Sequence, residues 1–269
     1  MRLSKHYGVL SLIKREAITS LLKKGERADG RGLDEFREIK VETGLVGKAE
    51  GSALVKLGDT KVVAGVKASI GTPFPDTPDK GVQIVNAELI PVASPIFEAG
   101  PPGEDDIELA RVIDRGLRSS GFIKLEELAI IPGKKVWTIF IDIYPLDHCG
   151  NLIDASGLAA VSATLTGHIF GVELKDEEVN VIEDSKKPIP LGSIPVFVTI
   201  AKIGDMLIVD PNYEEELVAD SIITFSINDK DEICAIQKSR SGAFHFDEII
   251  EAKKLALKAS KKIRSFLRS

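Results

Sequence analysis

The chain has 269 residues, 43% of them apolar, and a formal net charge of −6. It is long enough for one large globular domain or two of ordinary size, and its negative charge excludes a surface that coats nucleic acid or anionic lipid indiscriminately. Cys149 and Cys234 lie outside any Cys-x-x-Cys spacing, which indicates a reducing compartment. The apolar run at 7–13 is too short for a signal peptide or a membrane span, so we expect a cytoplasmic protein with no membrane partner.

The N-terminal part is predicted to be a helical arm followed by strands. Apolar residues recur at helical spacing as far as Leu22, and Gly25 stands where a C-terminal cap is expected, so residues 1–27 are assigned to the arm. β-branched and alternating runs then predict three strands, the last two joined as a hairpin. These strands span residues 36–41, 52–57 and 61–67.

The next segment alternates loops with regular structure. Prolines and glycines interrupt residues 71–81, which predicts a long exposed loop, and a strand is expected at 83–91. A Pro/Gly turn at 98–104 precedes a helix at about 105–119. The β-branched and aromatic residues of 136–144 predict a central strand.

The helix expected at 105–119 carries an arginine stripe. Arg111, Arg115 and Arg118 are spaced by four and three residues, so they share one helical face. Guanidinium groups on one face can bind successive phosphates bidentately. The plainer interpretation is a solvated face held by local pairs, since Glu108 and Asp114 stand three and four residues before an arginine. The spacing alone leaves both interpretations open.

The following helix and a chain boundary are predicted from composition. Residues 147–151 form a turn, after which Asp154 or Ser156 is expected to cap an apolar helix at 158–170 that is rich in small residues. Residues 183–192 are polar and broken by proline, so they are the predicted boundary between two lobes.

The C-terminal part has short strand signals and a final amphipathic helix. The helix starts near Phe246, with apolar residues at alternating spacings of three and four. The predicted strands cover residues 194–201, 206–210, 218–227 and 232–238. The chain is therefore expected to be an α+β protein with two similar lobes, at 28–182 and 183–269.

These motifs together resemble the RNase PH family of phosphate-dependent 3′ to 5′ exoribonucleases. The resemblance runs from Asp29-Gly30-Arg31 to the final helix and includes residues 51–60, 108–118, 141–144 and 154–158. It implies an RNase PH-type fold, with two βαβ-type lobes of mixed sheets and packed helices. More narrowly, segments at 41–45, 73–78, 142–147 and 210–216 look like the non-catalytic RNase PH-like subunit of the archaeal exosome ring.

The phosphate site that the resemblance implies is expected to be degenerate. In active members, the cap of the helix that corresponds to 158–170 carries a Thr-Arg or Ser-Arg pair that holds the attacking phosphate. We align Gly157 and Leu158 with that pair, and leucine donates no hydrogen bond. An ordinary capped helix, with Ser156 beside its N-terminus, is therefore favoured over a working phosphate site.

The acidic segment implied by the resemblance is also altered. Asp210 matches the first acid of active members, but Glu216 stands where the later aspartate is expected, and Asn212 replaces the acid between them. A longer side chain displaces the carboxylate, and a displacement of about 1 Å can cost about a hundredfold in rate. Glu214, Glu215 and Glu216 otherwise form a solvated acidic turn, so no metal site is expected.

The arginine helix keeps the family pattern. The resemblance places Arg111 and Arg115 where family members contact RNA phosphates, and it also aligns Arg118. Phosphate contacts position a strand without reading its sequence, so no base specificity is expected. The dispersed histidines, including His148, show no metal-ligand spacing, and contiguous residues such as 147–149 cannot form a catalytic triad.

The resulting hypothesis is a structural, RNA-contacting subunit without phosphorolytic activity of its own. The resemblance implies a catalytic RNase PH-like partner in an alternating hetero-hexameric ring, RNA-binding cap subunits, and single-stranded RNA as ligand. No cofactor is expected for this chain, whereas inorganic phosphate and Mg²⁺ are expected at the partner's site. The alternatives are an active phosphate-dependent 3′ to 5′ exoribonuclease and a free-standing RNA-binding module.

Overall fold

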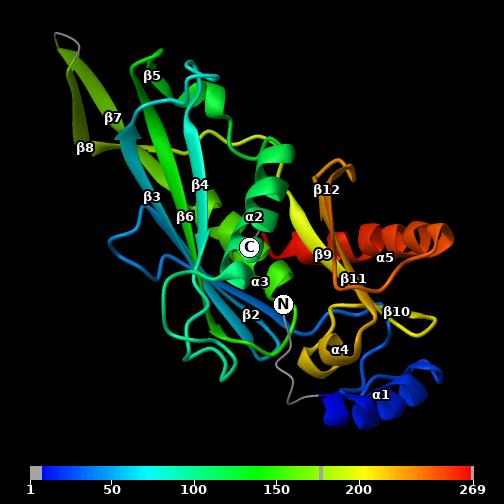
Figure 1. The fold of residues 1–269 in the computed structure, drawn as a ribbon. Coiled ribbons are helices and arrows are strands. Elements are labelled where there is room, and N and C mark those ends of the chain that lie inside the picture. Colours follow the sequence, from blue (N-terminus) through cyan, green and yellow to red (C-terminus); the bar gives the residue numbers. More distant parts are fainter. Residues whose placement is uncertain (1–7, 176–177, 268–269) are drawn as a thin grey trace.

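The computed structural model describes residues 8–175 and 178–267, and these form an α+β fold (Figure 1). The helices are α1 (Gly8–Leu22), α2 (Glu104–Ser119), α3 (Leu152–Leu165), α4 (Tyr213–Val218) and α5 (Phe246–Ser265), with a short 3-10 helix η2 (Leu125–Leu128). The strands are β1 (Ile39–Thr43), β2 (Gly51–Leu57), β3 (Thr60–Gly71), β4 (Val82–Ala87), β5 (Ala129–Ile131), β6 (Lys135–Asp147), β7 (His168–Lys175), β8 (Glu178–Pro188), β9 (Val196–Ile203), β10 (Met206–Val209), β11 (Ser221–Ile227) and β12 (Ile233–Ser239).

The first lobe is built on a mixed sheet in the order β1-β2-β3-β6-β4, with β5 paired to β6. Neighbouring strands in this sheet are antiparallel, except that β4 runs parallel to β6. Alternate residues of β3 are buried, as expected for a strand with one face on the core. The predicted hairpin is confirmed as β2 and β3, in which Leu57 pairs with Thr60.

The second lobe is an antiparallel sheet in the order β10-β9-β11-β12, with α5 against β9, β10 and β11. Helix α3 contacts β2, β3 and β6 of the first sheet and β9 of the second, so it is enclosed on both sides. Small residues make this possible: a Cβ on Gly116 of α2 or on Gly157 of α3 would lie 2.3 or 2.2 Å from the ring of Phe197 on β9. One phenylalanine thus packs α2 and α3 against the second sheet.

The prediction of a helix at 158–170 was wrong in its bounds. Helix α3 begins six residues earlier, at Leu152, and its N-cap is Asn151 rather than Asp154 or Ser156. The Asp154 carboxylate is instead directed to β9, where it accepts hydrogen bonds from the backbone and the hydroxyl of Thr199 at 2.9 and 2.7 Å. Residues 168–170 belong to β7, because the chain turns at Gly167 after the helix.

The predicted irregular boundary at 183–192 is in part regular structure. Residues as far as Pro188 belong to β8, which pairs with β7 as a two-stranded sheet that projects from the first lobe (Figure 1). The division into lobes at 28–182 and 183–269, and the arm at 1–27, stay predictions. Within the described ranges, no helix is long and apolar enough to cross a membrane.

Candidate functional site

The arginine stripe is exposed on α2, as predicted. The opposite face of the helix is buried, and Arg111, Arg115 and Arg118 all lie on the solvent side. The buried positions are Leu109, Ala110, Val112, Ile113, Gly116 and Leu117. The helical spacing of the apolar residues therefore fixes the direction of the guanidinium groups.

The three arginines differ in how far the fold already engages them. Arg118 forms an ion pair with Asp114 at 2.9 Å and donates to the Gln83 carbonyl at 3.1 Å. Among the residues that the structure describes, Arg115 makes one hydrogen bond, at 3.3 Å to Gln237 Oε1 on β12. For Arg111 the described part of the chain supplies no hydrogen bond or ion pair. The cations available to a ligand are thus Arg111 first and Arg115 second.

A groove runs along this stripe between α2 and the edge strand β4. Arg111, Arg115 and Arg118 form its cationic side, and Asp114 lies among them. The remaining lining comes from Gln83, Ile84, Val85, Ala110 and Ser119. A groove with guanidinium groups along one wall suits an extended polyanion.

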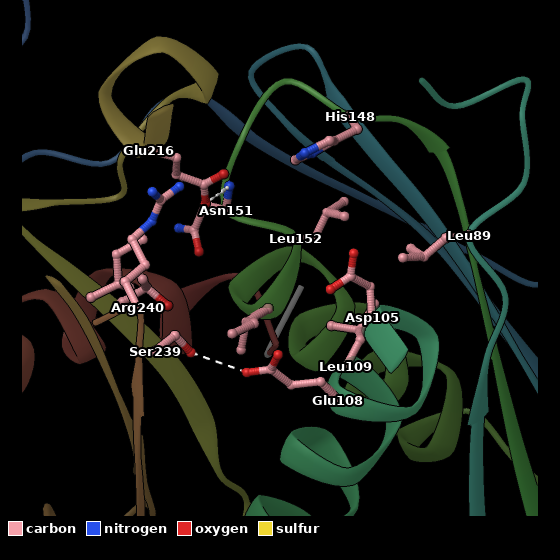
Figure 2. A pocket seen from close by; sticks show the side chains of 13 residues that line it. Leu89, Asp105, Glu108, Leu109, His148, Asn151, Leu152, Glu216, Ser239 and Arg240 are labelled. Atoms are coloured by element: carbon pink, nitrogen blue, oxygen red, sulfur yellow. Dashed lines mark hydrogen bonds between the residues drawn. The ribbon is translucent and has the colours of Figure 1, made fainter. Parts of the chain in front are cut away.

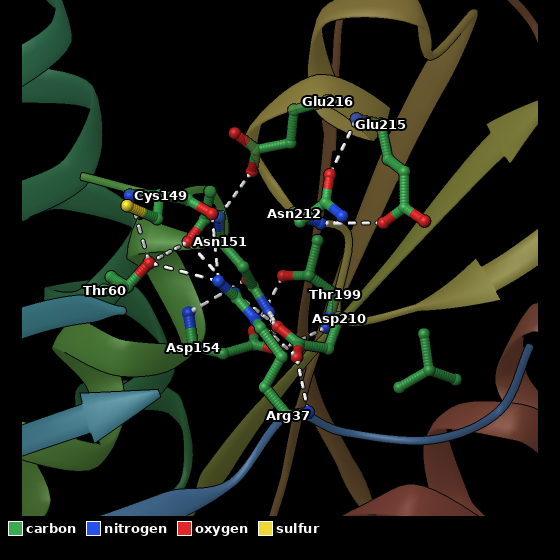
Figure 3. A network of polar contacts seen from close by, with 12 residues as sticks. Arg37, Thr60, Cys149, Asn151, Asp154, Thr199, Asp210, Asn212, Glu215 and Glu216 are labelled. Atoms are coloured by element: carbon green, nitrogen blue, oxygen red, sulfur yellow. Dashed lines mark hydrogen bonds and ion pairs between the residues drawn. The ribbon is translucent and has the colours of Figure 1, made fainter. Parts of the chain in front are cut away.

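Asp210 is the centre of a buried polar network (Figure 3). Its side chain is 0% exposed, and Arg37 binds it through Nη2 to Oδ1 at 2.7 Å and Nε to Oδ2 at 2.9 Å. Arg31 donates to Oδ2 at 2.9 Å, and Asn151 Nδ2 donates to Oδ1 at 2.7 Å. Both carboxylate oxygens are therefore engaged by donors of this chain, which leaves the group no open position toward a substrate.

The acidic segment after Asp210 was wrongly predicted to be a solvated turn. It forms α4, whose capping box pairs the Asn212 side chain with the backbone of Glu215 and the Glu215 side chain with the backbone of Asn212. Glu215 is 2% exposed, and Arg27 binds its carboxylate at 2.9 and 2.5 Å. Among the three glutamates, only Glu214 is exposed, where it pairs with Lys14 at 2.6 Å.

Glu216 of α4 reaches the N-terminus of α3. Its Oε1 accepts a hydrogen bond from the Asn151 backbone N–H at 2.7 Å. Burial raises the pKa of Glu216 to about 7, although the Asn151 bond and the charges of Arg240 and Arg37 act in the opposite direction. The group thus titrates near neutral pH.

Leu158 does not lie at the cap of α3, so this part of the site prediction is corrected. It belongs to the second turn of the helix and is 4% exposed in the core. The cap positions are Asn151 and Leu152, and leucine again stands directly after the cap. Ser156 is fully buried and its Oγ has no hydrogen-bond partner within the described residues, so it faces no substrate. As at Gly157 and Leu158, neither of the two residues at the observed cap is an arginine.

A cavity adjoins this N-terminus between the two lobes (Figure 2). Its lining includes His148, Asn151, Glu216 and Arg240, and α2 contributes Glu108, which accepts a 3.2 Å hydrogen bond from the Ser239 hydroxyl on β12. Its other lining residues are Leu89, Asp105, Leu109, Leu152, Ile153, Thr199 and Ile222. Burial lowers the pKa of His148 to about 4, so its imidazole is neutral at pH 7.

Sequence reasoning missed the residues that hold this region together. Arg27, Arg37 and Asn151 converge on Asp210 and on α4 from segments up to 188 residues apart in the chain. No local motif marks such partners; the only available signal was a set of cations near the Asp29-Gly30-Arg31 motif. Within the described ranges, no group of three or more His, Cys, Asp or Glu residues is arranged to hold a metal ion.

The fold and these sites define an RNase PH-type protein, and family models agree. Residues 35–169 match domain 1 of the 3′ exoribonuclease family, and residues 193–259 match domain 2. The chain belongs to this family. The predicted RNase PH-type fold is thereby confirmed.

Individual relatives narrow the similarity to exosome components. The exosome complex component Rrp42 of Thermococcus gammatolerans is 49% identical over 260 residues, which cover 96% of this chain and 95% of that protein. Rrp42 of Methanopyrus kandleri is 46% identical over 256 residues, which cover 95% of this chain and 96% of that protein.

Solved structures agree with these relatives. A chain of the Archaeoglobus fulgidus exosome with RNA bound to the active site superposes with a TM-score of 0.87 at 44% identity, covering 96% of this chain and 98% of that one. A chain of an archaeal exosome core superposes with a TM-score of 0.84 at 40% identity, covering 97% of this chain and 98% of that one.

Proposed function

We propose that this protein is a non-catalytic, RNA-contacting subunit of an exosome ring. The observation that carries the proposal is a contrast within one chain. Arg111 and Arg115 are exposed on α2 and available to a ligand, whereas Asp210 is enclosed by its own arginines and Leu152 follows the cap of α3. The chain keeps phosphate-binding cations but lacks an accessible phosphorolytic apparatus.

The relatives support an exosome role. Proteins that match nearly the whole chain are named exosome complex component Rrp42, and one of the matching structures is an exosome with RNA bound to the active site. We infer that this chain alternates with a catalytic RNase PH-like partner in a hexameric ring and adjoins RNA-binding cap subunits. Inorganic phosphate and Mg²⁺ would act at the partner's site, and the chain itself would need no cofactor.

The arginines would hold the RNA backbone near the partner's active site. Arg111 and Arg115 are one helical turn apart, so both can contact phosphates of a single extended strand. Such contacts fix the register and direction of the strand but carry no base specificity. The predicted contribution is therefore to RNA affinity and positioning, independent of sequence.

The test is RNA binding by the reconstituted complex at moderate salt. We expect the double variant Arg111→Glu plus Arg115→Glu to weaken RNA binding by more than about tenfold, because two attractive contacts become repulsive. The matched control is Lys253→Glu plus Lys261→Glu, which makes the same charge change at exposed positions of α5. Equal RNA affinity of the two double variants would overturn the proposal.

A second assay addresses the enzymatic alternative. The purified chain is incubated with poly(A), phosphate and Mg²⁺, and the release of nucleoside diphosphates is measured; we expect none. Turnover that is lost in Glu216→Gln would instead establish an active exoribonuclease. Mass measurement with and without the partner separates ring assembly from a monomeric RNA-binding module.

A further inference from the structure

Hydrogen-bond donors surround the N-terminus of α3 in the cavity of Figure 2. His148 is 6% exposed, and its Nε2 has no hydrogen-bond partner in the described part of the chain. Its Nδ1 accepts from the Gly150 N–H at 3.4 Å, so the proton of the neutral ring lies on the buried Nε2, and Figure 2 shows the imidazole beside the cavity. The first-turn amides of the 14-residue helix add a positive partial charge. Together these donors suit an oxyanion.

A carboxylate of the same chain already contacts this end of α3. Glu216 Oε1 accepts the Asn151 N–H at 2.7 Å, at the N-cap of α3. Arg240 lines the same cavity, and its charge acts on Glu216. Arg240 adopts a left-handed backbone with φ 67°, a conformation that non-glycine residues adopt at a cost.

The fold delivers Glu216 to this position rigidly. The start of α4 lies directly on the Gly150 loop: the Tyr213 N–H donates to the Cys149 carbonyl at 3.0 Å, and a Cβ on Gly150 would lie 2.4 Å from the Asn212 carbonyl carbon. The buried ion pair between Arg27 and Glu215 fixes α4 from its other side. Glu216 is therefore held at the N-terminus of α3 by backbone packing.

We propose that Glu216 acts as a built-in anion that occupies the oxyanion position at the N-terminus of α3 and excludes free phosphate or sulfate from it. This inference rests on the proposed function, because it gives a physical reason why the degenerate site does not take the attacking phosphate. An ionised carboxylate satisfies the Asn151 amide and repels any second anion at the same helix end.

Several charged groups face Glu216 and set when it is ionised. Arg240 and Arg37 favour the carboxylate, whereas burial and Asp210 favour the neutral acid, and the pKa of Glu216 is about 7. The neutral imidazole of His148 and two further carboxylates, Asp105 and Glu108, face the cavity from the other elements. Exclusion should therefore be strongest above pH 7 and weaken as Glu216 takes up a proton.

The test measures sulfate binding by calorimetry at pH 8, where Glu216 is mainly ionised. Sulfate keeps its charge across the pH range, unlike phosphate. We expect the wild-type chain to show no saturable binding and Glu216→Ala to gain at least about tenfold in sulfate affinity, which corresponds to about 1.4 kcal/mol. Adding Arg240→Ala to that variant should abolish the gain. Sulfate binding by the wild-type chain should increase as the pH is lowered from 8 to 6.

A matched control distinguishes the location of the Glu216 carboxylate from the mere loss of one negative charge on α4. Glu214→Ala removes an exposed carboxylate from the same helix and should leave sulfate binding absent. Where Glu216→Ala is unfolded by circular dichroism, Glu216→Gln gives the same test through a sulfate-dependent rise in Tm. Saturable sulfate binding by the wild type at pH 8, or no gain in a folded Glu216 variant, would overturn the inference.

These outcomes are distinct from failure of the proposed function. A folded Glu216→Ala variant without sulfate binding contradicts only the built-in anion, since Leu152 still accounts for a missing phosphate contact. Unchanged RNA affinity of the Arg111 and Arg115 double variant contradicts the RNA role whatever the sulfate result.

Discussion

Arg37 binds Asp210 bidentately, with Nη2 2.7 Å from Oδ1 and Nε 2.9 Å from Oδ2, and both side chains are almost fully buried. The Arg37 backbone N–H also donates to Oδ2 at 2.9 Å. This pair joins the segment before β1 to the segment after β10, so it connects the two lobes. The residue that most resembles a catalytic acid is thereby a structural element of the interface between them.

The first prediction concerns the loss of this carboxylate. Asp210→Asn should lower the free energy of unfolding by about 3–5 kcal/mol, because Arg37 would be left buried without its ion-pair partner and Arg31 would keep its pair with Asp29 but lose the one with Asp210. Urea denaturation at pH 7 measures the change. Asp205→Asn, at an exposed position of the turn before β10, is the control and should alter stability by less than about 0.5 kcal/mol. Similar midpoints for the two variants would refute the structural role of Asp210.

A second prediction ranks the arginines of α2 by their existing partners. Alanine substitution should reduce RNA affinity of the assembled complex most for Arg111, less for Arg115 and least for Arg118, since Arg118 already pairs with Asp114. Each lost phosphate contact should lower the slope of log affinity against log salt by about 0.7. RNA titrations at several salt concentrations test the order. A larger effect for Arg118 than for Arg111 would show that the existing ion pair does not limit ligand contact.

The α2 stripe could be predicted from the sequence because its information is local. Apolar residues at helical spacing define the buried face, and the guanidinium groups of Arg111, Arg115 and Arg118 follow from that geometry. The hairpin of β2 and β3 was equally local, since alternation and a short turn specify it.

The start of α3 and the environment of Glu216 depend on distant contacts. Asp154 is a good N-cap residue by type, but Thr199 on β9 takes its carboxylate, so the cap falls to Asn151. Glu216 was interpreted as solvated because nothing nearby in the sequence shows that α4 packs on the Gly150 loop. Tertiary packing thus overrode correct local preferences.

The third prediction is a pH dependence that arises from Asp154. Burial raises the pKa of this carboxyl from 3.8 to about 7, even though its hydrogen bonds to Thr199 and Asn151 act in the opposite direction. Between about pH 4 and pH 7 the folded state therefore binds more protons than the unfolded state, and Asp154 contributes a loss of stability as pH rises through this range. Below pH 4 both states are protonated and the contribution disappears.

Asp154→Asn should remove that pH-dependent loss. Asparagine can accept from the Thr199 and Asn151 nitrogens and donate to the Thr199 hydroxyl, so the network stays satisfied without a charge. Relative to wild type, we expect the variant to gain stability from pH 5 to pH 8, by roughly 1.4 kcal/mol for each unit of pKa displacement removed. Urea denaturation at pH 4.5, 6 and 8 measures this. A constant difference across the three pH values would contradict the raised pKa.

The last prediction concerns the backbone contact that places α4. Gly150 has φ 95°, and a Cβ at this residue would lie 2.4 Å from both the Asn212 carbonyl carbon and the Tyr213 nitrogen. Gly150→Ala should lower the free energy of unfolding by at least about 1–3 kcal/mol, since the backbone is strained and α4 must move away. Gly47→Ala is the control: nothing lies within 4 Å of its added Cβ, and a restricted unfolded chain should stabilise the protein by up to about 1 kcal/mol. Equal Tm values for the two alanine variants would show that the Gly150 contact does not position α4.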